Sequence, residues 1–153
     1  MKQDLAKYDL IELLAGESWP ETEQAKVVIG FTRALSGYVA EKLNPYFKDE
    51  DADELKKLAE QPEITPEQVI DFYKTRLPNL EEVLDEAILE LKKIFLVDVY
   101  QRKINEFEQK LAQADEDNRP AFESQLKAWQ SALEFSQQDD WDKVKQVLVV
   151  LPR

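Results

Sequence analysis

Residues 79–119 read NLEEVLDEAILELKKIFLVDVYQRKINEFEQKLAQADEDNR and contain neither proline nor glycine. Apolar side chains recur through this stretch at steps of three and four residues, the spacing of one face of an α-helix. The pattern predicts one helix over 80–114, about 50 Å long at 1.5 Å per residue. The stripe weakens at 98–103, where we expect any kink to lie. Its positions include Leu80, Leu84, Ile88, Leu91, Phe95, Val99, Ile104, Phe107 and Leu111.

A second long helix is expected after a short polar loop. Residues 115–120 end in a proline, which is favoured in the first turn of a helix. Because the apolar stripes on both sides of this loop share one rhythm, they predict an antiparallel helical hairpin. Asp139 or Asp140 is expected to cap a last helix that begins near Trp141. Residues 147–151 would suit a strand, but no partner strand is evident, so we expect them to end that helix.

Four shorter helices are expected in the N-terminal half of the chain. Each combines helical apolar spacing with a capping residue, a proline in the first turn or a breaker at its end. Gly16 is expected to stop the first of them. The expected ranges are 4–15, 19–43, 49–61 and 65–77.

The fold class follows from these elements. We predict an all-α protein in which a compact helical bundle over 1–97 precedes a hairpin extension over 98–153. The two parts share the helix 80–114 and form either two domains or one continuous domain. With only three glycines in 153 residues, the chain lacks the turn residues that a β-sandwich or barrel needs.

Two of these glycines lie on one face of an expected helix. Gly30, Ala34 and Gly37 follow one another at steps of four and three residues. A glycine inside a helix costs about 1 kcal/mol against alanine, so a pair on one face suggests compensation. We favour a groove where a second helix backbone comes close, over two glycines that are merely tolerated.

The composition excludes several classes of function. The chain has no cysteine and no histidine, which removes disulfides, zinc–thiolate sites, thiol catalysis and the commonest general base. Its net charge is −12, and residues 44–90 hold 14 acidic and five basic side chains. Because this charge repels phosphates and anionic lipids, we expect no nucleic-acid or membrane partner. A start without a signal-peptide pattern favours a cytoplasmic location.

Acidic clusters raise the question of a metal site. Asp49, Asp51, Asp53 and Glu60 have the spacing of calcium ligands in an EF-hand loop, but Glu54 stands where the loop requires glycine. The acids from Glu81 to Glu90 resemble those of helical di-metal sites, which also need histidine. We therefore expect no metal, no cofactor and no catalytic residue, and the chain is predicted not to be an enzyme.

An interaction surface is the remaining hypothesis. Tryptophans at helix starts either close the end of a core or anchor a partner, and a two-helix hairpin leaves one side of each stripe without cover. The chain is therefore predicted to bind a protein partner, or a second copy, through the hairpin. The alternatives are a carrier of a small apolar ligand and, third, an enzyme without a recognisable motif. The residues proposed for the surface are Trp19, Val99, Tyr100, Phe135, Trp141 and Val144.

Residues 1–97 resemble an uncharacterised family of small helical domains from candidate-phyla bacteria. The motifs that carry the resemblance are DLIELL at 9–14, WPE at 19–21, DADELKKL at 51–58, TPEQ at 65–68 and LPNLEEV at 77–83. The resemblance implies a compact helical domain in a bacterial cytoplasm, and the hairpin after residue 98 departs from it as an added module. It implies no activity, ligand or catalytic residue.

Overall fold

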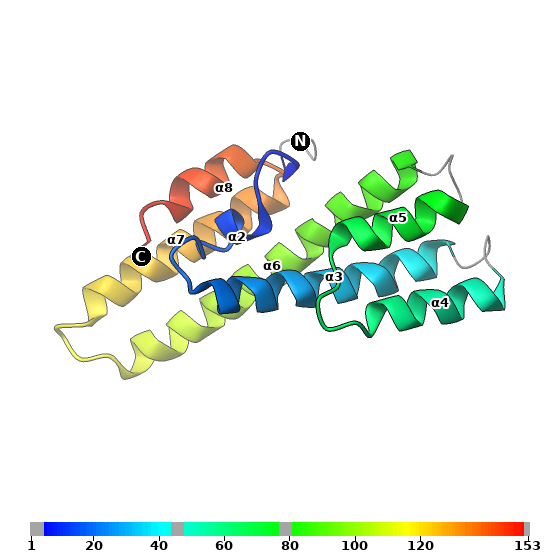
Figure 1. The fold of residues 1–153 in the computed structure, drawn as a ribbon. Coiled ribbons are helices and arrows are strands. Elements are labelled where there is room, and N and C mark those ends of the chain that lie inside the picture. The colour runs from blue at the N-terminus through cyan, green and yellow to red at the C-terminus, as the bar shows by residue number, and fades with distance from the viewer. Residues whose placement is uncertain (1–4, 44–47, 77–80, 152–153) are drawn as a thin grey trace. The chain divides into compact units, whose positions relative to one another are not determined.

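The computed structural model describes residues 5–43, 48–76 and 81–151, and every regular element in those ranges is an α-helix (Figure 1). The predicted all-α fold class is therefore confirmed. The helices are α2 (Leu10–Leu13), α3 (Glu21–Leu43), α4 (Asp49–Ala59), α5 (Pro66–Arg76), α6 (Glu81–Gln113), α7 (Arg119–Gln137) and α8 (Trp141–Leu148).

The helices belong to two compact units. One unit contains the N-terminal segment up to Trp19 together with the chain from Lys93 onward, and the other contains Pro20–Lys92. The long helix α6 runs through both, without a break at 98–103. The expected division between residues 97 and 98 therefore differs from the observed one, which assigns the N-terminal segment to the unit of the hairpin.

The hairpin itself has the predicted form. In Figure 1, α7 runs back along the C-terminal part of α6 after the turn at 114–118, and α8 then folds onto α7. Aromatic pairs join the two long helices, with ring centroids 5.8 Å apart for Tyr100 and Trp129 and 6.3 Å apart for Phe107 and Phe122. The predicted cap of the last helix is confirmed, since Asp140 Oδ1 accepts a hydrogen bond from the backbone N–H of Lys143.

The other unit packs α3, α4 and α5 around an apolar core. Thr65 and Gln68 form the expected capping box of α5, each side chain accepting a hydrogen bond from the other residue's backbone N–H. Arg76 links α5 to α4, because its Nε lies 3.1 Å from Asp51 Oδ1 and its guanidinium stacks 3.9 Å from the Phe72 ring centroid. Core side chains of this unit include Leu35, Val39, Leu55, Ile64, Val69 and Tyr73.

The prediction of one continuous helix over 4–15 is wrong in length. Only Leu10–Leu13 form α2, and Glu12 caps its start by accepting a hydrogen bond from the Asp9 N–H. Leu14 is the C-cap of the helix, and Ala15 follows it with a left-handed φ of 55°. The Gly16 N–H donates a hydrogen bond of 3.0 Å to the Ile11 carbonyl. This pattern is a Schellman motif in which alanine takes the position that glycine usually fills.

The prediction of a helix-packing groove along α3 is also wrong. Gly30, Ala34 and Gly37 are exposed, and a Cβ atom on either glycine would have no described neighbour within 4 Å. No described helix backbone approaches this face, so both glycines are tolerated without compensation from packing. Helix α8 ends at Leu148, so only Val147 and Leu148 of the expected helical tail are helical, and the described residues 149–151 form turns and no strand.

Candidate functional site

A segment from the N-terminus covers the hairpin. Residues 5–19, here called the N-terminal strap, bury Leu5, Leu13 and Leu14 almost completely. The buried Tyr100 hydroxyl on α6 donates a hydrogen bond of 2.5 Å to the Leu13 carbonyl. The Tyr8 hydroxyl donates one of 2.6 Å to Asp142 on α8. The strap therefore supplies the cover that the apolar stripes of a two-helix hairpin require.

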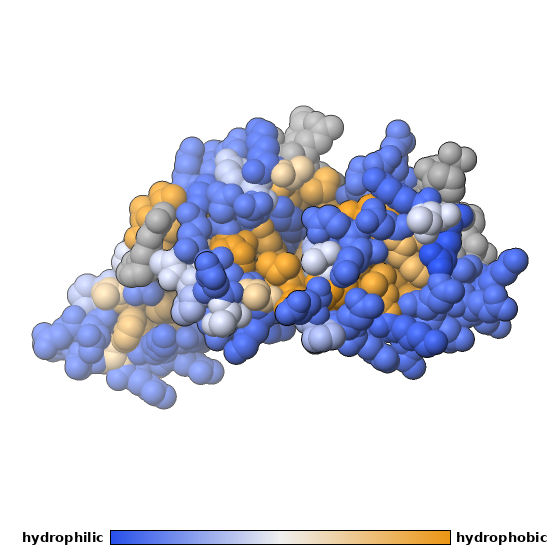
Figure 2. Space-filling model, in the orientation of Figure 1, coloured by the Kyte–Doolittle hydropathy of each residue, from blue (hydrophilic) through white to orange (hydrophobic). Residues whose placement is uncertain are grey.

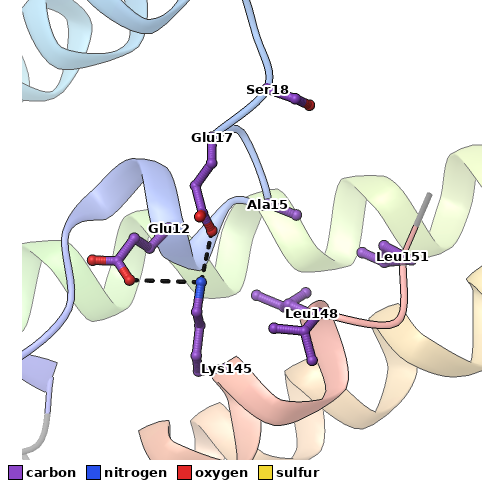
Figure 3. Close-up of a pocket in the computed structure, with 8 residues that line it drawn as sticks. Glu12, Ala15, Glu17, Ser18, Lys145, Leu148 and Leu151 are labelled. Carbon is purple, nitrogen blue, oxygen red and sulfur yellow. Dashed lines mark hydrogen bonds and ion pairs between the residues drawn. The ribbon is translucent and has the colours of Figure 1, made fainter. Parts of the chain in front are cut away.

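A lysine on α8 holds the strap by charge. Figure 3 shows Lys145 between two carboxylates of the strap, with its Nζ 2.6 Å from Glu17 Oε1 and 3.6 Å from Glu12 Oε2. The adjoining pocket, also lined by Leu148 and Leu151, has a volume of about 10 Å³, which accommodates about one water molecule. This ion-pair cluster fastens two elements and leaves no room for an organic ligand.

Three residues of the predicted surface do not lie on the surface. Tyr100, Trp141 and Val144 are each 0% exposed. Tyr100 and Val144 were expected to lack cover in a two-helix hairpin, whereas Trp141 was expected either to close the end of a core or to anchor a partner. The strap and the contacts between α7 and α8 enclose them instead, so their assignment to an interaction surface is corrected to the core.

The other three residues are half-buried. Trp19 packs its indole against the backbone of Gly16, where an added Cβ would lie 2.5 Å from the ring. Phe135 lies under Lys143, whose Nζ is 5.4 Å from the ring centroid. Val99 is half-buried on α6. These side chains come from the strap, α7 and α6, and none of the described pockets is lined by more than one of them.

Exposed apolar residues occur elsewhere. Figure 2 shows a face covered mainly by hydrophilic residues, with apolar residues gathered in separate areas between them. Among the described residues, the large apolar side chains with high exposure are Val83 (44%), Ile94 (55%), Val149 (53%) and Val150 (73%).

Ile94 belongs to an open groove between α6 and α7. The groove, here called the α6–α7 groove, has a volume of about 550 Å³. Its charged residues are balanced within the chain, since Lys93 Nζ lies 2.8 Å from Asp139 Oδ1 and Asp98 Oδ2 lies 2.6 Å from Arg102. The groove is lined by Lys93, Ile94, Val97, Asp98, Gln101, Leu133 and Gln137.

Sequence reasoning missed this groove. Ile94 and Val97 lie beside the main apolar stripe of α6, and each looked like an ordinary residue of a stretch rich in apolar side chains. The sequence signal that could have revealed the groove is the number of adjacent apolar residues, because residues 94–97 (IFLV) supply more apolar side chains than one helix face can bury.

A second pocket lies where the strap meets α6 and α7. This pocket, here called the aromatic pocket, has a volume of about 160 Å³. Trp19, Phe107 and Trp129 contribute three aromatic walls from three segments of the chain, and Lys103 and Gln125 contribute the polar groups. Its lining residues are Leu14, Ala15, Trp19, Lys103, Phe107, Gln125, Trp129 and Leu151.

The lysine of this pocket belongs to a small charge network on α6. Glu106 lies between two cations, with Oε2 at 3.4 Å from Lys103 Nζ and Oε1 at 3.2 Å from Lys110 Nζ. Burial raises the pKa of Glu106, but the hydrogen bond from Lys110 and the charges of both lysines outweigh it and leave the pKa below its usual value. The network therefore carries one positive charge more than negative at neutral pH.

The geometry of α4 argues against a calcium-binding loop at residues 49–60. Asp49, Asp51 and Asp53 lie within a helix rather than a loop, and the Asp51 carboxylate is bound by Arg76. Across residues 5–43, 48–76 and 81–151, no three acidic side chains gather in a way that could hold a metal ion. Within the same ranges, no helix combines the length and apolarity needed to span a membrane.

No family model, curated protein or solved structure matches this chain. The resemblance of residues 1–97 to a family of small helical domains stays a prediction. The assignment of function therefore depends on the geometry of the hairpin unit.

Proposed function

We propose that the chain is a non-catalytic protein–protein interaction module whose α6–α7 groove binds the apolar face of a partner's amphipathic helix. The observation that carries the proposal is the exposure of Ile94, 55%, over a groove that Val97 and Leu133 also line. Two antiparallel helices with an apolar groove between them provide the complement of a third helix, and helix-in-groove binding is a common mode of peptide recognition.

The dimensions of the groove favour a helix over a second copy of the chain. Seven residues line it, whereas a stable protein–protein interface of standard size uses roughly 20–30 residues on each side. A second copy would also bring its own net charge of −12, and like charge opposes association. A single partner helix meets neither obstacle.

The charge of the groove specifies the partner further. Because Lys93 and Asp98 are already paired within the chain, apolar contact supplies the affinity and the helix needs no strongly charged face toward the groove. Basic residues on its outer side would still accelerate association with a chain of net charge −12.

A labelled model peptide tests the proposal. We would measure fluorescence anisotropy of an 18-residue amphipathic helix with leucine at i, i+3, i+4 and i+7 and lysine on the opposite face. Binding by the full chain, lost in Ile94→Asp and with a peptide whose leucines are replaced by serine, supports the proposal. Val83→Asp is the matched control, since Val83 is exposed on the same helix outside the groove. Equal binding by both variants, or no binding by the wild type, contradicts the proposal.

A further inference from the structure

The aromatic pocket has a composition that suits a small ligand. Trp19 comes from the strap, Phe107 from α6 and Trp129 from α7, so the pocket exists only where these three segments meet. Phe107 and Trp129 are 7% and 5% exposed, which fixes two walls in the core, and the half-buried Trp19 forms a third. The three rings supply flat apolar walls and Lys103 and Gln125 supply polar groups, and small-molecule sites combine both kinds of lining.

The polar groups favour an anion. Lys103 Nζ lies 5.9 Å from the centroid of the Trp129 ring and shares Glu106 with Lys110. Since Lys110 alone can neutralise Glu106, Lys103 can turn to a ligand carboxylate without leaving a charge unpaired. Gln125 adds an amide that can donate a further hydrogen bond. This local surplus of positive charge contrasts with the net charge of −12.

We propose that the aromatic pocket binds a small aromatic carboxylate, with the ring of the ligand against Trp19, Phe107 and Trp129 and its carboxylate on the Lys103 ammonium. The volume of about 160 Å³ accommodates a single-ring acid rather than a lipid or a larger cofactor. This site is separate from the α6–α7 groove, since the two share no lining residue.

Phenylacetate is a suitable probe, and the three tryptophans of the chain report on it. In ¹H–¹⁵N spectra of the full chain, saturable shifts are expected for the indole N–H signals of Trp19 and Trp129. The signal of Trp141, which is buried outside the pocket, should stay in place. Shifts of all three signals, or none that saturate, overturn the proposal.

Two comparisons test the role of the charge. Lys103→Gln should weaken phenylacetate binding about tenfold, because it removes a charge-assisted hydrogen bond, whereas Lys127→Gln removes an exposed charge outside the pocket and should have no effect. Phenylacetamide, which lacks the negative charge, should bind the wild type and Lys103→Gln equally weakly. Equal affinity of the wild type for the acid and the amide overturns the proposal. Ile94→Asp should leave phenylacetate binding unchanged, which separates this site from the groove.

Discussion

Gly16 and Trp19 occupy adjoining space at the end of the strap: a Cβ atom on Gly16 would lie 2.5 Å from Cε3 of the Trp19 ring. The glycine is therefore needed for a close contact, since the left-handed position of the turn belongs to Ala15, with φ of 55°. Two neighbouring residues divide the roles that one helix-ending glycine often combines.

Gly16→Ala should lower the free energy of unfolding by about 1–3 kcal/mol, the usual cost of overpacking a filled site. The new methyl group must displace the Trp19 indole, so the fluorescence of the folded state should change as well. Urea unfolding followed by circular dichroism measures the loss. An unchanged midpoint would show that the indole moves away at no cost.

Ala15→Gly should have the opposite effect. A left-handed conformation costs an L-residue about 1–2 kcal/mol, and the extra freedom of glycine in the unfolded chain returns about 0.4–1 kcal/mol of that. We expect a net gain near 0.5–1 kcal/mol in the same urea experiment. A loss of stability would mean that the Ala15 methyl group contributes more by lining the aromatic pocket than its backbone strain costs.

The local sequence predicted the long helices and failed at the strap. Leu84, Ile104 and Phe107 repeat a helical period over many turns without proline or glycine, and this signal gave α6, α7 and the hairpin correctly. The spacing of Leu5, Leu10 and Leu13 also fits a helix, but tertiary contacts decide the outcome there. Tyr8 turns to Asp142 across 134 residues of sequence, and no local pattern records that partner.

The candidate site shows the same limit. Tyr100 and Val144 were correctly identified as side chains that need cover, yet which segment covers them depends on contacts between distant parts of the chain. Ile94 in turn is exposed because no described element packs over it, although its immediate sequence resembles a core. Sequence therefore identified the apolar surplus of the hairpin and misassigned its buried and exposed members.

The glycines of α3 give a third prediction. Gly30→Ala and Gly37→Ala should each raise the free energy of unfolding by about 1 kcal/mol, because both positions are helical, exposed and free of described neighbours within 4 Å. The double variant should approach the sum, since the two sites share no contact. A destabilised variant in thermal unfolding would reveal a partner for this face and restore the groove hypothesis.

Buried tyrosines make the fold sensitive to alkali. Burial raises the pKa of both Tyr73 and Tyr100 well above the ordinary value of about 10. Above that pH the unfolded chain releases protons that the native chain retains, so stability present below pH 10 is lost as the pH rises. The expected slope is about 1.4 kcal/mol per pH unit for each buried hydroxyl.

Urea unfolding between pH 9 and pH 12 measures this slope. Tyr73→Phe removes one ionisable group and should make the slope shallower by that amount. Lys42 and Lys74, whose pKa values are raised by hydrogen bonds to Glu90 and Glu81, add to the alkaline loss in both proteins and cancel in the comparison. Equal slopes for the wild type and the variant would show that Tyr73 ionises in the native state.

The ion-pair cluster of Lys145 should limit the local opening of the strap. Lys145 joins the carboxylates of Glu12 and Glu17 with side chains that are between 21% and 38% exposed, and such partly screened pairs contribute up to about 1 kcal/mol. Lys145→Gln should therefore speed hydrogen exchange of the Gly16 amide, which bonds to the Ile11 carbonyl, by about two- to fivefold. Lys143→Gln is the control, because the ion pair described for Lys143 joins it to Asp140 at the start of its own helix.

If both variants leave the exchange rate of the Gly16 amide unchanged, the strap is held by Leu5, Leu13 and the Tyr100 hydrogen bond alone. If 0.5 M salt speeds hydrogen exchange of the Gly16 amide in the wild type and not in Lys145→Gln, the ion-pair cluster holds the strap through charge.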